Sequence, residues 1–335
     1  MGMIKVLSNY APEPLVKALR KFGIIMHKAQ ADLISLLRLS YDYDIIYSIK
    51  SLSTIDRSLL KSLFMRRNKD HVVIYGLHMP MTLDNKVRPT HVMYDVLNPT
   101  QPVIASLRGF WIHTLNLRDY RMALNMGLRA LYMPLGTDTN IFKCSLEKPN
   151  EFTVIYASRP AWHKGTDILV NVIIPFLLKK IKNIRIVITD SNYDYMAWIY
   201  EKLKGIPNIT LYPHLPLNEY AKVLSEAHVL LFPTRYESYG LVVLDAMATG
   251  VIPVSFKVRG FIEDVLMRTE FRDYVVNYPD VHGFLVKVMR LYELYNNHVD
   301  KYEKLTIKAC NLARLFSWDN VAGKWAYELN FILNK

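Results

Sequence analysis

The amino-acid sequence predicts an α/β protein made of two doubly wound parallel sheets, each with helices on both faces. The first observation is that short apolar runs alternate with amphipathic helical patterns along most of the chain. The second is that 335 residues are more than one hydrophobic core usually holds. The third is that turn-forming residues concentrate between two such alternating halves, from Pro134 to Asn150.

The first half shows the alternation from its beginning. A short apolar run is followed by Leu15, Ala18, Leu19 and Phe22, whose i, i+3, i+4, i+7 spacing predicts one face of a helix. Strands are expected at Met3–Ser8, Asp44–Ile49, Val72–Leu77, Val103–Leu107 and Leu131–Leu135. Helices are expected at Pro14–Phe22, Ile55–Arg67 and Leu117–Met126.

The second half repeats the pattern more regularly. Strands are expected at Phe152–Ala157, Ile184–Thr189, Ile209–Tyr212 and Val229–Phe232, and helices at Thr166–Ile181, Tyr193–Lys204, Asn218–Glu226 and Tyr239–Ala248. We therefore expect a first domain at residues 1–145 and a second at 146–315. Residues 316–335 are expected to form a C-terminal helix that packs back toward the first domain.

Composition limits the class of protein. The longest apolar stretch, Ile168–Leu178, has eleven residues and contains Asn171 and Pro175, whereas a membrane-spanning helix needs roughly 20 apolar residues. The first residues, Met1 to Val6, show no apolar signal-peptide pattern, so secretion is not expected. Cys144 and Cys310 are too few for a disulfide framework and lack metal-ligand spacing, which indicates a reducing compartment. A cytoplasmic protein is expected.

The net charge of +12 is uneven along the chain. Residues 1–143 carry 19 Lys and Arg against 10 Asp and Glu, or +9, and the remainder carries 23 against 20, or +3. An anionic partner and a merely solvated cationic surface both explain this excess. The basic stretch Ile55–Lys69 leaves two alternatives open, a helix lying on anionic lipid and a core-packed helix with a cationic back. No nucleic-acid-binding signature accompanies the charge, so nucleic acid is not expected as a partner.

One candidate site lies just after the expected strand Val229–Phe232. Glu237 stands in the loop, Gly240 permits a close approach, and free N–H groups near Ser238 and Tyr239 would offer an anion site at a helix start. Asp245 follows at a distance of roughly 8 Å along the helix axis, which suits two contacts on one extended ligand. The alternative is structural: Glu237 tops a loop, and Asp245 pairs with a basic neighbour.

A second candidate site follows the expected strand Phe152–Ala157. Arg159 and Lys164 precede a helix, whose dipole favours anions at this end. Two cations at this end are unfavourable for the helix, and a bound anion would compensate their charge. An Arg–Lys pair suits a diphosphate. Two solvated loop cations are the alternative.

Together these segments resemble the retaining, nucleotide-sugar-dependent glycosyltransferases of glycosyltransferase family 4. Glu237-Ser-Tyr-Gly-Leu-Val-Val-Leu-Asp245 is similar to the family's Glu-x7-Glu signature, and Arg159 and Lys164-Gly165 are similar to its Gly-Arg-Leu…Lys-Gly segment. Three further segments match the family in the expected order: Pro134–Phe142, His282–Val286 and Phe316–Asp319. The resemblance therefore covers most of residues 130–335. It implies the GT-B fold, in which two Rossmann-like domains face each other across a cleft.

The resemblance also implies roles for individual residues. Glu237 would face the donor sugar and the diphosphate, and Asp245 would hold the ribose hydroxyls. Arg159 and Lys164 would neutralise the leaving diphosphate, so neither a metal nor a cofactor is required. His78 sits where the family often has a histidine near the reacting sugar. The donor-binding set is completed by Ser238, Tyr239, Gly240, Leu241, Gly260 and Phe261.

The function expected from this resemblance is transfer of a sugar from a nucleoside diphosphate to an acceptor hydroxyl, by front-side substitution with retention. The acceptor, whether lipid, glycan or protein, stays open, and the enzyme is expected in the cytoplasm, with peripheral membrane contact open. One alternative is a basic nucleic-acid or envelope-binding protein on an inactive scaffold. Another is a sugar-nucleotide epimerase or phosphorylase on the same fold.

Overall fold

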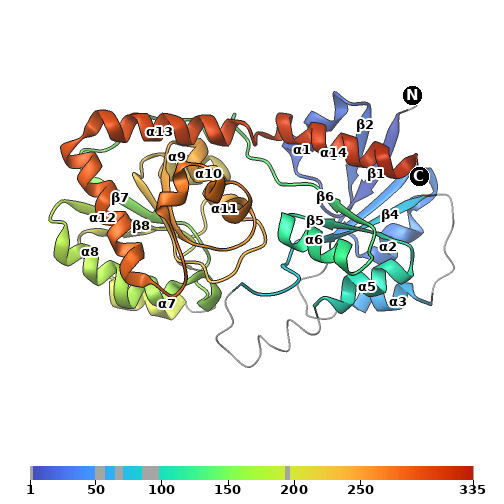
Figure 1. Cartoon of the computed structure of the whole chain (residues 1–335), viewed down its shortest axis with the longest axis horizontal. Coiled ribbons are helices and arrows are strands. Elements are labelled where there is room, and N and C mark those ends of the chain that lie inside the picture. The colour runs from blue at the N-terminus through green and yellow to red at the C-terminus, as the bar shows by residue number, and fades with distance from the viewer. Residues whose placement is uncertain (1–2, 50–56, 65–70, 85–97, 193–196, 335) are drawn as a thin grey trace. The chain divides into compact units, whose positions relative to one another are not determined.

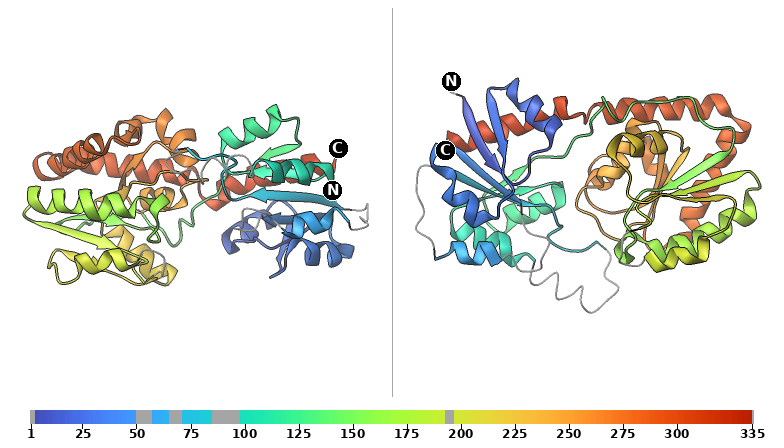
Figure 2. Two further views of the ribbon diagram at one scale, coloured as in Figure 1. Left: turned by 90° about the horizontal axis from the view of Figure 1, so that it is seen from below. Right: turned by 180° about the vertical axis from the view of Figure 1, so that it is seen from behind.

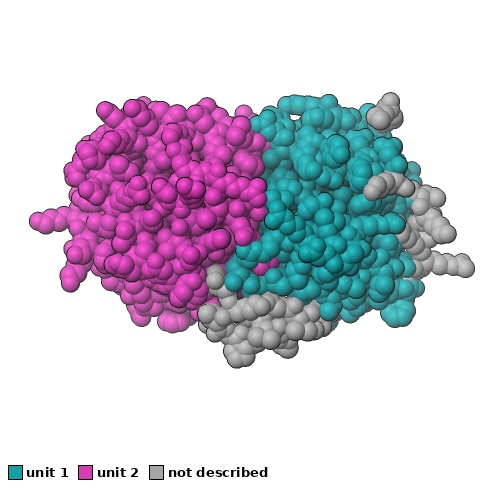
Figure 3. All heavy atoms as spheres, viewed as in Figure 1, with its two compact units in different colours: residues 1–136, 237–239, 318–335 teal, residues 137–236, 240–317 magenta. Residues whose placement is uncertain are grey.

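The computed structural model describes residues 3–49, 57–64, 71–84, 98–192 and 197–334. Its contacts divide the chain into two compact units, coloured separately in Figure 3. Unit 1 comprises Met1–Gly136, Glu237–Tyr239 and Trp318–Lys335, and unit 2 comprises Thr137–Tyr236 and Gly240–Ser317. The sequence boundary expected at 145/146 thus lies nine residues beyond the division at Gly136, and a three-residue segment of the second half belongs to unit 1.

Unit 1 is built on a six-stranded parallel sheet with the order β2-β1-β3-β4-β5-β6. The order reverses beside β1, which is the switch point of a doubly wound sheet. The strands are β1 (Ile4–Ser8), β2 (Ile24–Lys28), β3 (Ile45–Ile49), β4 (Val72–Leu77), β5 (Trp111–Thr114) and β6 (Ala130–Tyr132).

Helices cover both faces of this sheet. One face packs on a cluster of buried side chains to which α2 (Leu33–Arg38), α3 (Arg57–Ser62), α5 (Thr100–Leu107) and α6 (Leu117–Asn125) contribute. Helices α1 (Glu13–Arg20) and α14 (Trp318–Leu333) lie side by side, as Figures 1 and 2 show. The C-terminal helix therefore packs within unit 1, where the Trp325 Nε1–H donates to the Pro134 carbonyl at 2.8 Å.

Unit 2 repeats the architecture with the strand order β12-β11-β10-β7-β8-β9, again all parallel. Its strands are β7 (Phe152–Tyr156), β8 (Ile184–Ile188), β9 (Ile209–Leu211), β10 (Val229–Phe232), β11 (Ile252–Phe256) and β12 (Val275–Val276). Its helices are α7 (Thr166–Ile168), α8 (Ile174–Lys180), α9 (Leu217–Ser225), α10 (Leu241–Ala248), α11 (Phe261–Asp264), α12 (Val281–Asn297) and α13 (Val299–Arg314). Strands β7, β10 and β11 are buried at every position, because helices cover both faces.

The expectation of two doubly wound parallel sheets is confirmed, but one element was predicted with the wrong structure. Val103–Leu107 lies in helix α5, and the neighbouring strand is Trp111–Thr114. Five consecutive apolar or small residues fit either a buried strand or the core-facing part of a helix, so periodicity alone does not decide. The helix expected at Ile55–Arg67 is described at Arg57–Ser62, and part of the expectation lies outside the described residues.

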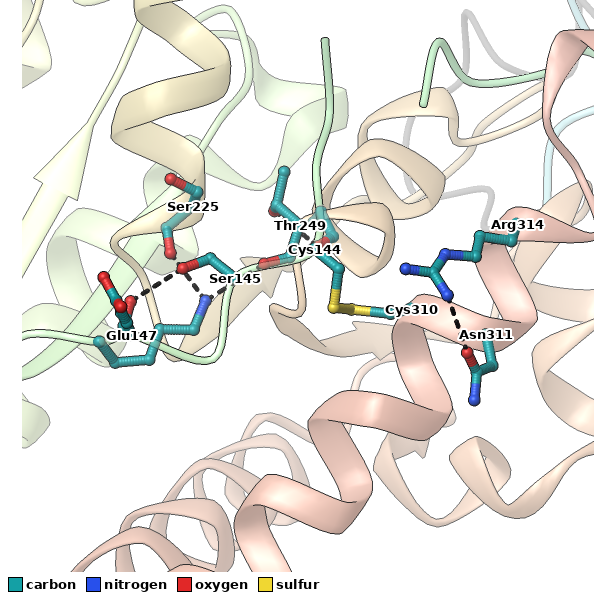
Figure 4. Close-up of a disulfide and its surroundings, with 10 residues drawn as sticks. Cys144, Ser145, Glu147, Ser225, Thr249, Cys310, Asn311 and Arg314 are labelled. Atoms are coloured by element: carbon teal, nitrogen blue, oxygen red, sulfur yellow. Dashed lines mark hydrogen bonds between the residues drawn. A yellow bond between two sulfur atoms is a disulfide. The ribbon is translucent and has the colours of Figure 1, made fainter. Parts of the chain in front are cut away.

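The two cysteines correct a second expectation. Cys144 and Cys310 form a disulfide that joins the segment before β7 to α13, across 166 residues of sequence (Figure 4). The segment is held further by Lys148, whose ammonium donates to the carbonyls of Ser225 at 2.7 Å and Thr249 at 3.3 Å. The cysteine content is therefore no argument for a reducing compartment, and the cytoplasmic location stays a prediction.

The helices of the described residues are too short or too polar to cross a membrane. None of them combines the length and the apolar character that a membrane span requires.

Candidate functional site

Three loops leave the carboxyl ends of neighbouring strands in the sheet of unit 2. The loop 157–165 follows β7, the loop 233–240 follows β10, and the loop 257–260 follows β11. Since β11, β10 and β7 are adjacent and parallel, these loops share one edge of the sheet. Ligands of doubly wound sheets bind at this edge, so the topology alone places the predicted Arg159, Lys164, Gly240 and Gly260 in the region where a ligand is expected.

The first two loops contact each other through Gly165. This residue has φ +75°, and a Cβ atom built there would lie 2.1 Å from the Pro233 carbonyl oxygen. Only glycine therefore fits without displacing the backbone. Nearby, the rings of His163 and Tyr236 stack at 5.0 Å with an interplanar angle of 16°. The two loops thus form one packed surface.

Arg235, which the sequence pattern did not single out, fixes the first loop. Its guanidinium is buried and donates to both carboxylate oxygens of Asp167, at 2.7 and 2.8 Å, and to the Trp162 carbonyl. It also lies 4.1 Å from the centre of the Trp162 ring. A bidentate ion pair of this kind fixes the orientation of the Arg235 guanidinium as well as its distance from Asp167. Because the partners are separated by 68 residues, sequence spacing gave no signal for the pair.

The predicted cations occupy this fixed loop. Arg159 is exposed, and Lys164 is half-buried in a short 3₁₀ turn with its ammonium 6.0 Å from the centre of the Phe232 ring. Asp167 lies in the first turn of α7, so a carboxylate of the chain itself already meets the helix dipole. The case for a bound anion therefore rests on the placement of the two cations rather than on an uncompensated helix.

The predicted segment before α10 is largely committed to unit 1. Glu237 accepts the backbone N–H of Ser238 at 3.0 Å, so that amide is already occupied. The Ser238 hydroxyl donates to the His78 carbonyl at 2.8 Å, and the Tyr239 hydroxyl donates to the Leu135 carbonyl at 2.7 Å. Gly240 is the N-cap of α10 with φ +88°, and Leu241 is the first helical residue.

Asp245 is buried in α10 and bonded to another part of unit 2. Its Oδ1 accepts a hydrogen bond from the Thr137 hydroxyl at 2.6 Å. Burial raises the pKa of Asp245 to about 7, although the Thr137 bond acts in the opposite direction. The carboxyl group thus has one oxygen engaged within the protein, and the predicted ribose contact would fall to the other.

Gly260 presents backbone rather than side chain. Its φ of +85° and ψ of −142° belong to a region that is essentially open only to glycine. The side chain of Phe261 is buried against the Phe316 ring, with centroids 5.2 Å apart. These two residues therefore have only main-chain groups to offer a ligand, and the backbone role predicted for them stays a prediction.

His78 follows β4 in unit 1 and is half-buried. Its Nε2 lies 2.9 Å from the Tyr47 hydroxyl oxygen. Burial, with a further contribution from His113, lowers the pKa of His78 to about 3. The ring is therefore neutral near pH 7, and it acts there as a hydrogen-bonding group rather than as a cation. His78 and Ser238 meet within unit 1, whereas Arg159, Lys164, Asp245 and Gly260 belong to unit 2.

The two parallel six-stranded sheets define a protein of the GT-B fold. Sucrose-phosphate synthase from Thermosynechococcus elongatus superposes with a TM-score of 0.72 at 16% identity, covering 99% of each chain. A glycosyltransferase from Rickettsia africae superposes with a TM-score of 0.66 at 14% identity, covering 99% of this chain and 90% of that one. At such identities the likeness establishes the fold alone.

Sequence comparison finds a family match in the unit that carries the candidate site. Residues 151–294, which lie mostly in unit 2, match the family model for Glycosyl transferases group 1. The chain is 27% identical to a glycogen synthase of Thermodesulfovibrio yellowstonii, over 54% of this chain and 35% of the relative. It is 24% identical to a glycogen synthase of Desulfitobacterium hafniense, over 50% of this chain and 36% of the relative. These matches thus span about a third of each relative's length.

Proposed function

We propose that the protein is a retaining glycosyltransferase that moves a sugar from a nucleoside diphosphate to an acceptor hydroxyl. The observation that carries the proposal is the loop edge of β7, β10 and β11, where Arg159 and Lys164 stand on a loop fixed by Arg235, in a domain of a glycosyltransferase family. Membership of glycosyltransferase family 4 and retention at the anomeric carbon are parts of this proposal.

The proposed chemistry follows from charge. As the bond between the anomeric carbon and the diphosphate oxygen breaks, negative charge grows on the diphosphate, and Arg159 and Lys164 stabilise it electrostatically. The main-chain N–H groups of Gly260 and Phe261 add neutral donors. The acceptor hydroxyl attacks the same face, and its proton passes to the departing phosphate oxygen. No metal is required, because the cations supply the positive charge.

The remaining predicted residues position the donor. We assign Glu237 to the donor sugar and the diphosphate, and Asp245 to the ribose hydroxyls through the carboxylate oxygen that Thr137 leaves open. We assign His78 to the reacting sugar. The acceptor, whether lipid, glycan or protein, is not identified by these contacts.

The test is nucleotide release from a panel of nucleotide sugars, with NMR assignment of the anomeric configuration in the product. We expect Lys164→Ala and Glu237→Ala each to lower kcat/KM by about 10²-fold or more, as for the loss of one transition-state contact. Lys204→Ala is the matched control, because Lys204 is exposed and pairs with Glu201, three residues earlier in the chain. Release unaffected by either site variant would refute the assignments. An inverted product would refute retention, and an isomerised or phosphorolysed sugar would favour the epimerase or phosphorylase alternative.

We also propose an anionic membrane surface as a partner of unit 1. In and after α3, Leu59 is buried, whereas Leu60, Leu63 and Phe64 are exposed, the last to 92%. Arg57 and Lys61 are exposed on the same short element. Exposed apolar groups beside cations suit an interface that offers both hydrocarbon and negative charge. The other predicted cations of this stretch lie outside the described residues.

A further inference from the structure

Four groups of unit 1 form a continuous line of hydrogen bonds. The His113 Nε2 lies 2.7 Å from the Met133 carbonyl oxygen, and its Nδ1 lies 2.8 Å from the Tyr47 hydroxyl oxygen. The same hydroxyl oxygen lies 2.9 Å from the Nε2 of His78. Tyr47 and His113 are both buried, so water is not needed to complete the line.

The sheet explains how Tyr47 reaches His113. Tyr47 is on β3 and His113 on β5, with β4 between them, and Gly76 of β4 pairs directly with His113. A Cβ atom at Gly76 would lie 2.9 Å from the Tyr47 hydroxyl oxygen. The absent side chain therefore opens the passage through which the hydroxyl crosses the middle strand.

The direction of each bond follows from the carbonyl at the end of the line. A carbonyl only accepts, so His113 carries its proton on Nε2. Burial lowers the pKa of His113 to about 4, so the ring is neutral near pH 7 and its Nδ1 is an acceptor. Tyr47 must then donate to His113, and its oxygen accepts from the Nε2–H of His78. The neutral His78 ring is left with a lone pair on Nδ1.

The lone pair on Nδ1 is available to a ligand. Within the part of the chain that the structure describes, this nitrogen makes no hydrogen bond, and the His78 residue is half-buried rather than fully enclosed. The ring itself is held in place, because Tyr10 packs edge-on against it with centroids 4.5 Å apart. Trp325 packs in the same manner on Tyr47 and His113, at 5.7 and 5.1 Å. Both the orientation and the proton of His78 are thereby fixed.

We propose that Tyr47 and His113 are positioning residues that hold the ring proton of His78 on Nε2, so that Nδ1 accepts a hydrogen bond from a hydroxyl group of the donor sugar. The sugar as ligand rests on the proposed function, whereas the position of the proton rests only on the contacts within unit 1. The two parts are therefore tested separately.

The proton position is tested by NMR of full-length protein labelled with ¹⁵N-histidine, because ¹⁵N shifts separate protonated from unprotonated ring nitrogens. His78→Gln and His113→Gln assign the signals. We expect His78 to be protonated on Nε2 in the native protein and to lose that preference in Tyr47→Phe. Tyr43→Phe is the matched control, since Tyr43 bonds the ring of His27 at 3.0 Å, away from the line. A His78 protonated on Nδ1, or one unaffected by Tyr47→Phe, would overturn the proposal.

The link to the sugar is tested by kinetics and binding. We expect Tyr47→Phe and His113→Leu to lower kcat/KM for the nucleotide sugar about tenfold, roughly the value of one neutral hydrogen bond. His113→Asn keeps an acceptor for Tyr47 and should restore most of the loss. Affinity for the free nucleoside diphosphate, which lacks the sugar, should not change. Equal losses in the Asn and Leu variants, or weaker binding of the nucleoside diphosphate alone, would indicate a merely structural role. A correct proton position with no transfer from any donor would leave the positioning role standing and refute the proposed function.

Discussion

At the residue scale, two glycines of unit 2 have similar backbones and very different surroundings. Gly165 and Gly205 have φ values of +75° and +79°. A Cβ atom at Gly165 would strike the Pro233 carbonyl, whereas at Gly205 it would meet nothing within 4 Å. The first glycine is required by a contact between two loops, and the second only by its conformation.

The pair separates backbone strain from loop contact. We expect Gly205→Ala to lower the free energy of unfolding by about 1 kcal/mol, the strain of a left-handed residue. Gly165→Ala adds a backbone collision, so we expect a loss of about 3 kcal/mol. Urea unfolding of both variants measures the difference. Equal losses in the free energy of unfolding would mean that the contact between the loops after β7 and β10 contributes nothing to stability. This result would contradict a tightly packed surface between the two loops.

At the scale of single elements, the short helix α3 has too few inward residues to bury its apolar side chains. Leu59 packs into the core, whereas Phe64, five residues further on and just beyond the end of α3, is almost fully exposed. The sequence contains both apolar and basic residues here, but their spacing does not show which side chains face the core. The exposure of Leu60, Leu63 and Phe64 supports the proposed membrane contact, which stays a proposal beside the core-packed alternative.

Vesicle sedimentation tests this role of α3. We expect binding to vesicles that contain phosphatidylserine, weak binding to phosphatidylcholine alone, and release as salt rises, because surface attraction is screened. Phe64→Ser should weaken binding about tenfold, since burying one aromatic side chain is worth roughly 1.5–3 kcal/mol. Leu107→Ser removes another exposed apolar side chain of unit 1, 77% exposed, and should have no effect. Identical behaviour of the two variants would exclude α3 as the contact.

Prediction from sequence succeeded where information is local and failed where it is not. Fully buried strands such as Val229–Phe232 and Phe152–Tyr156 are continuous apolar runs with clear ends, and they were found. Val103–Leu107 was assigned to a strand because a short apolar run fits a buried strand as well as the core-facing part of a helix. Arg235 and Tyr47 were missed as positioning groups because their partners come from distant segments that only the folded sheets bring together.

At the scale of the whole molecule, the two units differ in how they respond to acid. In unit 1, burial lowers the pKa of His78 to about 3 and of His113 to about 4, from an ordinary value of 6.5. Below pH 6.5 the unfolded chain therefore binds more protons than folded unit 1 does. The free energy of unfolding of unit 1 decreases as the pH is lowered. In unit 2, burial lowers the pKa of His228 to about 3 but raises that of Asp245 to about 7, and these two contributions oppose each other.

The expected result is that acid destabilises unit 1 first. Each buried histidine contributes up to about 1.4 kcal/mol per pH unit below 6.5, so unit 1 loses up to about 2.7 kcal/mol per unit between pH 6.5 and 4.5. In unit 2, protonation of Asp245 stabilises the folded state as the pH falls over the same range, and this gain offsets the loss from His228. Pulse proteolysis at several pH values, with fragments assigned by mass spectrometry, measures each unit. Loss of protection at the same pH in both units would contradict these pKa shifts.

The bond between Cys144 and Cys310 turns most of unit 2 into a covalent ring. A protease that cuts once anywhere between these positions leaves two fragments that travel together on a denaturing gel until a thiol is added. Backbone damage in the loops after β7, β10 or β11 therefore does not release the C-terminal helix, which stays tethered to the rest of the chain.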